Sequence, residues 1–120
     1  MAAVLALGLD PDFVDVSSMP GLKPEMIRAY IEAQLERIRG LGHDVDSCLV
    51  DSGKSAEAVL TETLRKRAYD CVMVGAGLRA PEQLILFEKL LNLVHVHAPG
   101  AKICFNTSPA DSAEAVQRWL

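Results

Sequence analysis

Four short apolar segments, each followed at once by glycine or polar residues, constrain the fold of this chain most. The residues that follow the four segments are, in order, Gly8 with Asp10, Asp51 to Gly53, Gly75 to Gly77, and Asn106 to Ser108. Stretches with helical periodicity separate the segments, so strands and helices alternate, which favours a parallel sheet covered by helices. Ligands of such sheets bind beyond the carboxyl ends of the strands. The sequence therefore predicts an α/β protein with a candidate site along one rim.

The pattern places each element to within a few residues. Strands are expected near residues 4–8, 46–50, 70–74 and 102–105. Helices are expected at 24–40, from Ser55 onward, at 82–98 and from Pro109 onward. Within the second helix, Ala56, Val59, Leu60 and Leu64 should be buried, and Trp119 and Leu120 should pack at the end of the last one. At 120 residues the chain is expected to form one domain, a three-layer sandwich of flavodoxin-like type with strand order 2-1-3-4.

Composition excludes two classes of partner. Twelve basic and sixteen acidic residues give a net charge of −4, which argues against a protein that binds a nucleic-acid backbone. No segment reaches the roughly 18 apolar residues of a membrane span.

The cysteines, Cys48, Cys71 and Cys104, are odd in number and have no metal-site spacing. We therefore expect buried, reduced thiols and a cytoplasmic protein.

The segment after the third expected strand matches the glycine pattern of dinucleotide-binding loops. Gly75, Gly77 and Arg79 lie in the run GAGLRA, where a backbone without side chains could approach a phosphate. Pro81 removes one amide from the helix entrance, and no acidic residue ends the next strand to hold a ribose. A tight structural turn is therefore favoured over a dinucleotide site. Arg79 remains a candidate to steady an anion.

The acidic residues after the first two strands form a second candidate site. Asp10, Asp12 and Asp51 could surround a cation, since oxygen ligands suit Mg²⁺. The run Asp10-Pro11-Asp12-Phe13-Val14 resembles the opening motif of the haloacid-dehalogenase-like phosphatases, which implies a nucleophile at Asp10 and a general acid at Asp12. Asp10 and Asp12 could also stand for the acidic pair of a degenerate phospho-receiver domain used for association. The same residues suit a turn rich in Asp and Pro, which is the favoured interpretation.

The third candidate site lies where the last strand meets the last helix. Asn106, Thr107 and Ser108 precede Pro109, with Asp111 three residues after Ser108. This spacing is typical of a capped helix start, whose free amides bind phosphate or carboxylate groups. Ser108 is expected to cap its own helix, which leaves Asn106 and Thr107 for a ligand.

The helix expected at 82–98 is apolar around most of its circumference. Such a helix needs cover on more than one side, whereas a four-stranded sheet covers only one. We therefore predict a homodimer whose interface includes Leu86, Leu90, Leu93 and Val94. The alternative is that another element of the same chain covers the helix.

Three segments of the chain resemble small bacterial α/β proteins that have no assigned activity. The segments are residues 69–72 (YDCV), 86–90 (LFEKL) and 105–109 (FNTSP). The resemblance implies a flavodoxin-like or Rossmann-like fold, and it identifies neither catalytic residues nor a cofactor. The candidate sites and the apolar helix predict two alternative functions. One is binding of an anionic or phosphorylated small molecule at the strand ends. The other is association as a non-catalytic dimer through the third helix.

Overall fold

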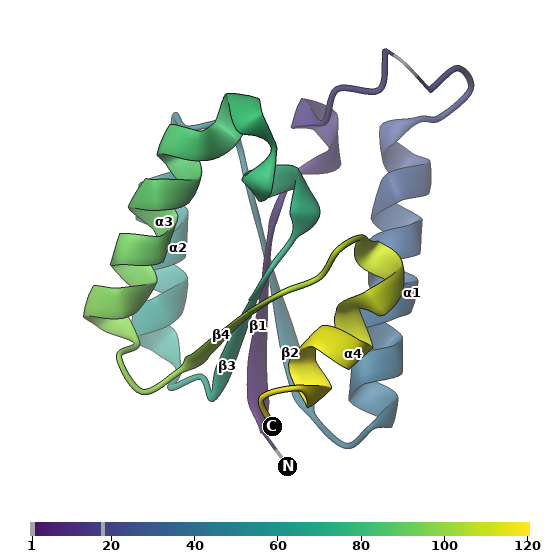
Figure 1. Ribbon diagram of the computed structural model, residues 1–120. Coiled ribbons are helices and arrows are strands. Elements are labelled where there is room, and N and C mark those ends of the chain that lie inside the picture. The colour runs from purple at the N-terminus through teal and green to yellow at the C-terminus, as the bar shows by residue number, and fades with distance from the viewer. Residues whose placement is uncertain (1, 18) are drawn as a thin grey trace.

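The computed structural model describes residues 2–17 and 19–120 of the chain. Four parallel strands form one sheet in the order β2-β1-β3-β4, as the sequence predicted. The strands are β1 (Ala3–Leu9), β2 (Asp44–Val50), β3 (Cys71–Val74) and β4 (Lys102–Phe105). The helices are α1 (Pro24–Gly40), α2 (Ala56–Lys66), α3 (Leu84–His97) and α4 (Ser112–Gln117). Figure 1 shows the sheet between two helical layers, which confirms the three-layer α/β architecture.

The helix boundaries follow from local chemistry. α1 starts at Pro24, whose fixed φ suits the first helical position, and the chain leaves the helix through Gly42 at a φ of 97°. Three 3₁₀ turns begin with a proline, at Pro11, Pro81 and Pro109, and the last two lead directly into α3 and α4. The helix expected at 82–98 therefore becomes regular only at Leu84.

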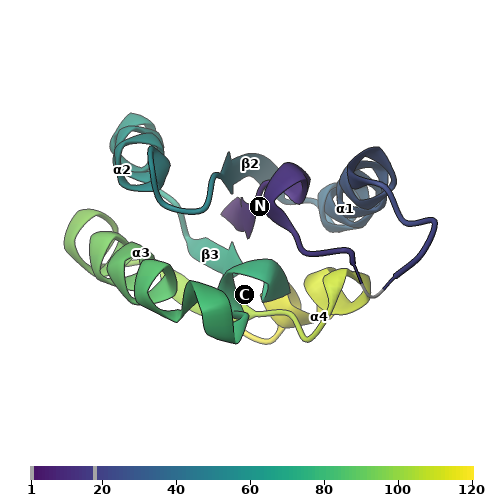
Figure 2. The same cartoon turned by 90° about the horizontal axis from the view of Figure 1, so that it is seen from above.

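The two faces of the sheet differ in the size of their side chains. We call the face under α2 and α3 the closed face, and the face under α1 and α4 the hollow face; Figure 2 shows the two helix pairs on opposite sides of the sheet. In β1 the closed face receives Leu5, Leu7 and Leu9, whereas the hollow face receives Val4 and Ala6. The alternation follows from the two-residue period of a strand. On β1, large residues thus face one side of the sheet and smaller residues face the other.

The apolar side of α3 packs onto the closed face within the same chain. Leu86, Leu90 and Val94 are all buried and belong to the cluster beneath α2 and α3. The prediction that these three residues form a dimer interface is therefore wrong, because they already lie in the interior. α3 also packs beside α2, which supplies the second covering surface that the helix needs, and Leu93 is partly buried against the same cluster.

Three other expectations about burial are corrected. Val59 was expected in the core, but its position on α2 leaves it 38% exposed. Trp119 and Leu120, expected to pack at the end of the last helix, follow that helix and are 54% and 43% exposed. Within the described part of the chain, no helix combines the length and apolar character that crossing a bilayer requires.

Candidate functional site

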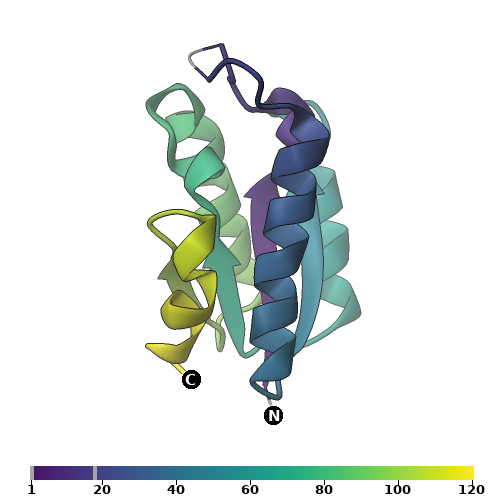
Figure 3. The same cartoon turned by 90° about the vertical axis from the view of Figure 1, so that its right-hand side faces the viewer.

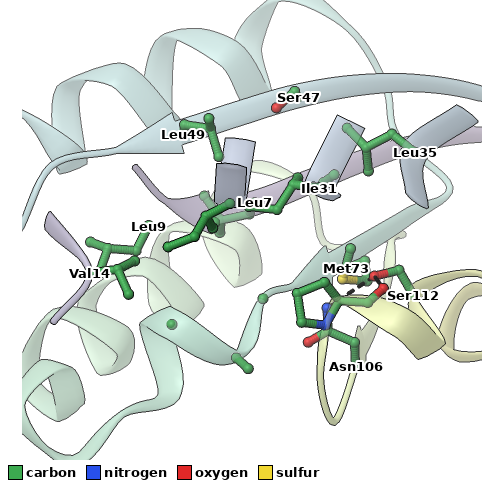
Figure 4. Close-up of a pocket in the computed structure, with 17 residues that line it drawn as sticks. Leu7, Leu9, Val14, Ile31, Leu35, Ser47, Leu49, Met73, Asn106 and Ser112 are labelled. Carbon is green, nitrogen blue, oxygen red and sulfur yellow. Dashed lines mark hydrogen bonds between the residues drawn. The ribbon is translucent and has the colours of Figure 1, made fainter. Parts of the chain in front are cut away.

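A cavity of about 220 Å³ opens on the hollow face near the carboxyl ends of β1 and β3. Small residues of the sheet form its floor, chiefly Ala6, Gly8 and Gly75, and Ile27 and Ile31 of α1 form one wall. Figure 4 shows Ile31, Leu35, Leu49 and Met73 around the same space. The cavity lies where β1 presents only the methyl group of Ala6 and the hydrogen atom of Gly8 toward α1, so the space between helix and sheet is not filled at this point.

One end of the cavity is polar. Asn106 and Ser112 line it, and their side chains are 4% and 2% exposed. Asn106 Nδ2 donates to Ser112 Oγ at 3.1 Å, drawn as a dashed line in Figure 4, and Ser112 Oγ donates to the carbonyl of Pro109 at 2.8 Å. An amide nitrogen carries two hydrogens and a hydroxyl oxygen two lone pairs. One N–H of Asn106 and one lone pair of Ser112 therefore remain for a ligand.

Among the described residues, no charged side chain lines this cavity. The other lining residues are apolar or are glycine, except Ser47 at the β2 side. A charged group placed there would lose its hydration and find no opposite charge, which costs several kcal/mol. The cavity therefore suits a neutral molecule.

The glycines predicted to admit a phosphate lie against β1. Gly75 and Gly77 both line the cavity, so the structure places them at the expected rim. The Gly75 amide donates to the carbonyl of Leu7 at 2.8 Å, and a Cβ on Gly77 would lie 3.4 Å from the Cβ of Leu9. These contacts join the loop to β1, and the Gly75 amide is already occupied.

Arg79 is held by the chain itself. Its guanidinium donates to the carbonyl of Val74 at 2.6 Å, to Asn106 Oδ1 at 3.3 Å and to the carbonyl of Asn106. It also lies over the ring of Phe105, 5.1 Å from the centroid. Arg79 thus fastens the end of β3 to the end of β4, and it does not line the cavity.

The hydrogen-bond donors after β4 that were predicted to bind an anionic ligand already bind a carboxylate of the chain itself, that of Asp111. The amides of Thr107 and Ser108 donate to Asp111 Oδ1 at 2.8 and 3.3 Å, and the Thr107 hydroxyl donates to Oδ2 at 2.6 Å. The Thr107 hydroxyl, followed by the two amides, lowers the pKa of Asp111 from 3.8, although burial opposes the effect. The carboxylate of the chain therefore occupies the position predicted for a ligand, and Ser108 caps the turn as expected.

The three acidic residues predicted to surround a cation serve separate local roles. Asp10 accepts from Arg28 at 3.0 Å and from the Asp12 amide at 2.9 Å, which together lower the pKa of Asp10. Asp12 lies 3.7 Å from the same guanidinium. Asp51 accepts the hydroxyl and amide of Ser55 at the start of α2, and these bonds lower its pKa. In the described ranges, no group of three or more Asp, Glu, His or Cys side chains could hold a metal.

Most of the cavity wall was not predicted from the sequence. Ala6, Gly8, Ile27 and Ser112 were not proposed as site residues, yet all four line it. For Ala6 and Gly8 the signal was present in the alternation Leu-Ala-Leu-Gly-Leu of residues 5–9, which places the large side chains on one face only. Of the predicted site residues, Gly75, Gly77 and Asn106 meet at the cavity.

Comparison with known proteins does not assign the chain to a family: no protein-family model and no curated protein matches it.

Proposed function

We propose that the protein binds a small molecule, mainly apolar and with one uncharged polar group, in the cavity at the carboxyl ends of β1 and β3. The observation that carries the proposal is a cavity without charged lining residues whose polar end is formed by Asn106 and Ser112. This retains the small-molecule function expected from the sequence and changes the expected ligand from an anion to a neutral molecule. Parallel sheets hold ligands at this end in general, which supports the location.

The expected affinity for a linear alcohol can be estimated from the part of its alkyl chain that the cavity buries. Six methylene groups transferred from water contribute roughly 5 kcal/mol, at about 0.8 kcal/mol each. A polar group that hydrogen-bonds to Asn106 adds about 1 kcal/mol. The cost of association reduces this sum, so a linear alcohol should bind with a Kd on the order of 1 mM, equivalent to about 4 kcal/mol.

The experiment is a titration with 1-alkanols from butanol to decanol, monitored by calorimetry and by the shift in Tm. Affinity should rise with chain length and then stop rising once the cavity is full. Octanoate, with the same chain and a carboxylate, should bind more weakly than 1-octanol. If octanoate, nucleotides or sugar phosphates stabilise the protein and neutral alcohols do not, the ligand is anionic and the neutral-ligand proposal is wrong.

Matched variants locate the binding site. Ala6→Leu fills the cavity from its floor and should abolish alcohol binding, whereas Ala33→Leu adds the same bulk to an exposed position of α1. Ser112→Ala should weaken 1-octanol about fivefold, because it removes the partner of Asn106 and one hydrogen-bond acceptor, worth about 1 kcal/mol. Ser47→Ala, which lines the opposite end, should leave the affinity unchanged. Binding that survives Ala6→Leu would show that the alcohols bind elsewhere.

Formation of a homodimer through α3 is the second candidate function, with interface residues that differ from those expected from the sequence. The apolar side chains that α3 leaves exposed include Leu84, Ile85 and Val96, at 59%, 65% and 66%. We propose that any homodimer uses these residues instead of the buried ones. Sedimentation over a range of concentrations tests this: a dimer that Ile85→Glu dissociates supports it, and a monomer throughout contradicts it.

A further inference from the structure

Two of the three cysteines form a buried thiol pair that the proposed function does not use. Cys71 on β3 and Cys104 on β4 are 0% and 3% exposed, and their sulfur atoms lie 3.5 Å apart. Both side chains belong to the hydrophobic cluster of the hollow face. The third cysteine, Cys48, lies on β2 and belongs to the cluster of the closed face, so the sheet separates it from the pair.

We propose that Cys71 and Cys104 are a redox-active pair, which a low-molecular-weight disulfide such as glutathione disulfide oxidises reversibly to an intramolecular disulfide. One thiol, as its thiolate, attacks glutathione disulfide and releases one glutathione. The second thiol loses its proton to water, attacks the resulting mixed disulfide at the protein sulfur and releases the second glutathione. Two protein thiols are oxidised while one glutathione disulfide is reduced to two thiols, so the exchange balances. This inference does not rest on the proposed function.

The contact between the two sulfurs favours the first step. A thiolate at Cys71 accepts a hydrogen bond from the Cys104 thiol, which lowers the pKa of Cys71 although burial opposes it. Cys104, as the donor, keeps its proton, and the loss of that bond together with burial raises its pKa. The thiolate, and not the thiol, is the nucleophile in disulfide exchange.

Bond formation requires a small movement of β4. Cys71 pairs with Lys102 and Met73 pairs with Cys104, so the two cysteines are diagonal neighbours. Diagonal Cα atoms lie about 7–8 Å apart, whereas a disulfide spans at most about 6.8 Å. β4 has only four residues and stands at the edge of the sheet, bonded to β3 on one side among the described strands. Such an edge strand can open locally, which admits the oxidant, and can then shift toward β3.

The test is oxidation of the native wild-type protein with glutathione disulfide, followed by unfolding, alkylation with N-ethylmaleimide and peptide mapping by mass spectrometry. We expect one maleimide label, on Cys48, a protein mass lower by two hydrogen atoms before alkylation, and a linked pair of peptides containing Cys71 and Cys104. Dithiothreitol should restore labelling of all three thiols. Hydrogen exchange of the oxidised protein should change in β4 more than in β1.

Variants separate this result from chance oxidation. Cys48→Ala should still form the linkage, and Cys104→Ala should stop at a mixed disulfide or remain reduced. Three maleimide labels on the oxidised wild type, a stable glutathione adduct without ring closure, or a bond that involves Cys48 would each overturn the proposal. Because the wild-type map alone decides among these outcomes, a cysteine variant that fails to fold does not affect the test.

Discussion

The two faces of this sheet are built from alternate residues of the same strands, and they differ in how completely they are filled. The closed face places Leu5, Leu7 and Leu9 of β1 beneath two helices of 11 and 14 residues. The hollow face has Ala6 and Gly8 on the same strand, under α1 and the six-residue α4. Figure 3 shows that α4 covers only the lower part of the sheet beside α1. Both faces bury a hydrophobic cluster, but only the hollow face leaves space near the strand ends, where ligands of parallel sheets bind.

The largest expected difference comes from truncating one leucine on each face. Leu90→Ala on the closed face should lower the free energy of unfolding by about 4 kcal/mol, because a well-packed site collapses poorly around the new cavity. Leu35→Ala on α1 should cost about 2 kcal/mol, since Leu35 already borders empty space and has fewer neighbours to lose. Urea unfolding of both variants measures the difference. Equal losses would show that the two faces are packed alike.

The role of Arg79 provides the next test. Arg79→Met should lower the free energy of unfolding by about 2–3 kcal/mol, because the partly buried carbonyls of Val74 and Asn106 lose their donor. The control is Arg28→Met, which removes an ion pair from an exposed arginine and should cost less than about 1 kcal/mol. Thermal and urea unfolding measure both variants. An Arg79→Met protein as stable as the wild type, with weaker anion binding, would favour the anion site predicted from the sequence.

Enlarging one residue on each face should give effects of opposite sign. Gly8→Ala adds a methyl group toward the cavity, where its Cβ would lie 3.4 Å from Leu49 Cδ2, and we expect stabilisation of up to about 1 kcal/mol. Val72→Ile adds a methylene group to the closed face and should destabilise by about 1 kcal/mol or more. Urea unfolding gives both values. Destabilisation by Gly8→Ala would mean that the hollow face has no room for one more carbon atom.

The smallest effect is expected at low pH, at the turn that borders the hollow face. The folded-state pKa of Asp111 lies below 3.8, so its ionised form stabilises the fold above that pH, and this contribution is lost as the pH falls through the folded-state value. A carboxyl-carbon NMR titration should therefore give a midpoint below 3.8. In Thr107→Val, which removes the hydroxyl donor and keeps the amide, the midpoint should move upward. An unchanged midpoint would show that the Thr107 hydroxyl does not stabilise the charge.

The fold was predictable because its signals are local and repeat along the chain. The expected helix at 24–40 coincides with α1, and the expected strand at 102–105 coincides with β4. Strand direction followed from the helices between strands, since a helix must carry the chain back before the next parallel strand. The interior position of Leu86 and Leu90 was not predictable in the same way. It depends on how closely α3 lies beside α2, which the sequence of α3 alone does not contain.

The site was predictable only in its location. The rim at the strand ends was expected, but the ligand chemistry assigned to it rested on residue types that turned out to be engaged elsewhere. The carboxylate of Asp111 accepts hydrogen bonds from Thr107 and Ser108, and the guanidinium of Arg79 donates to backbone carbonyls. A sequence shows which groups can bind an anion, whereas only the structure shows which of them the chain has already occupied. The cavity itself depends on residue size across three strands and on the short length of α4.

The two ends of the described chain lie on the side of the sheet away from the strand carboxyl ends, which has a practical use. The Ala2 amide donates to His43 Nδ1 at 3.4 Å, and His43 Nε2 lies 3.0 Å from Gln117 Oε1, so a single imidazole bridges the first strand and the last helix. Figure 1 places both labelled ends at the edge of the sheet opposite the strand carboxyl ends. The protein can therefore be immobilised on a sensor chip through a tag at either end, with the surface attached on the side away from the strand carboxyl ends.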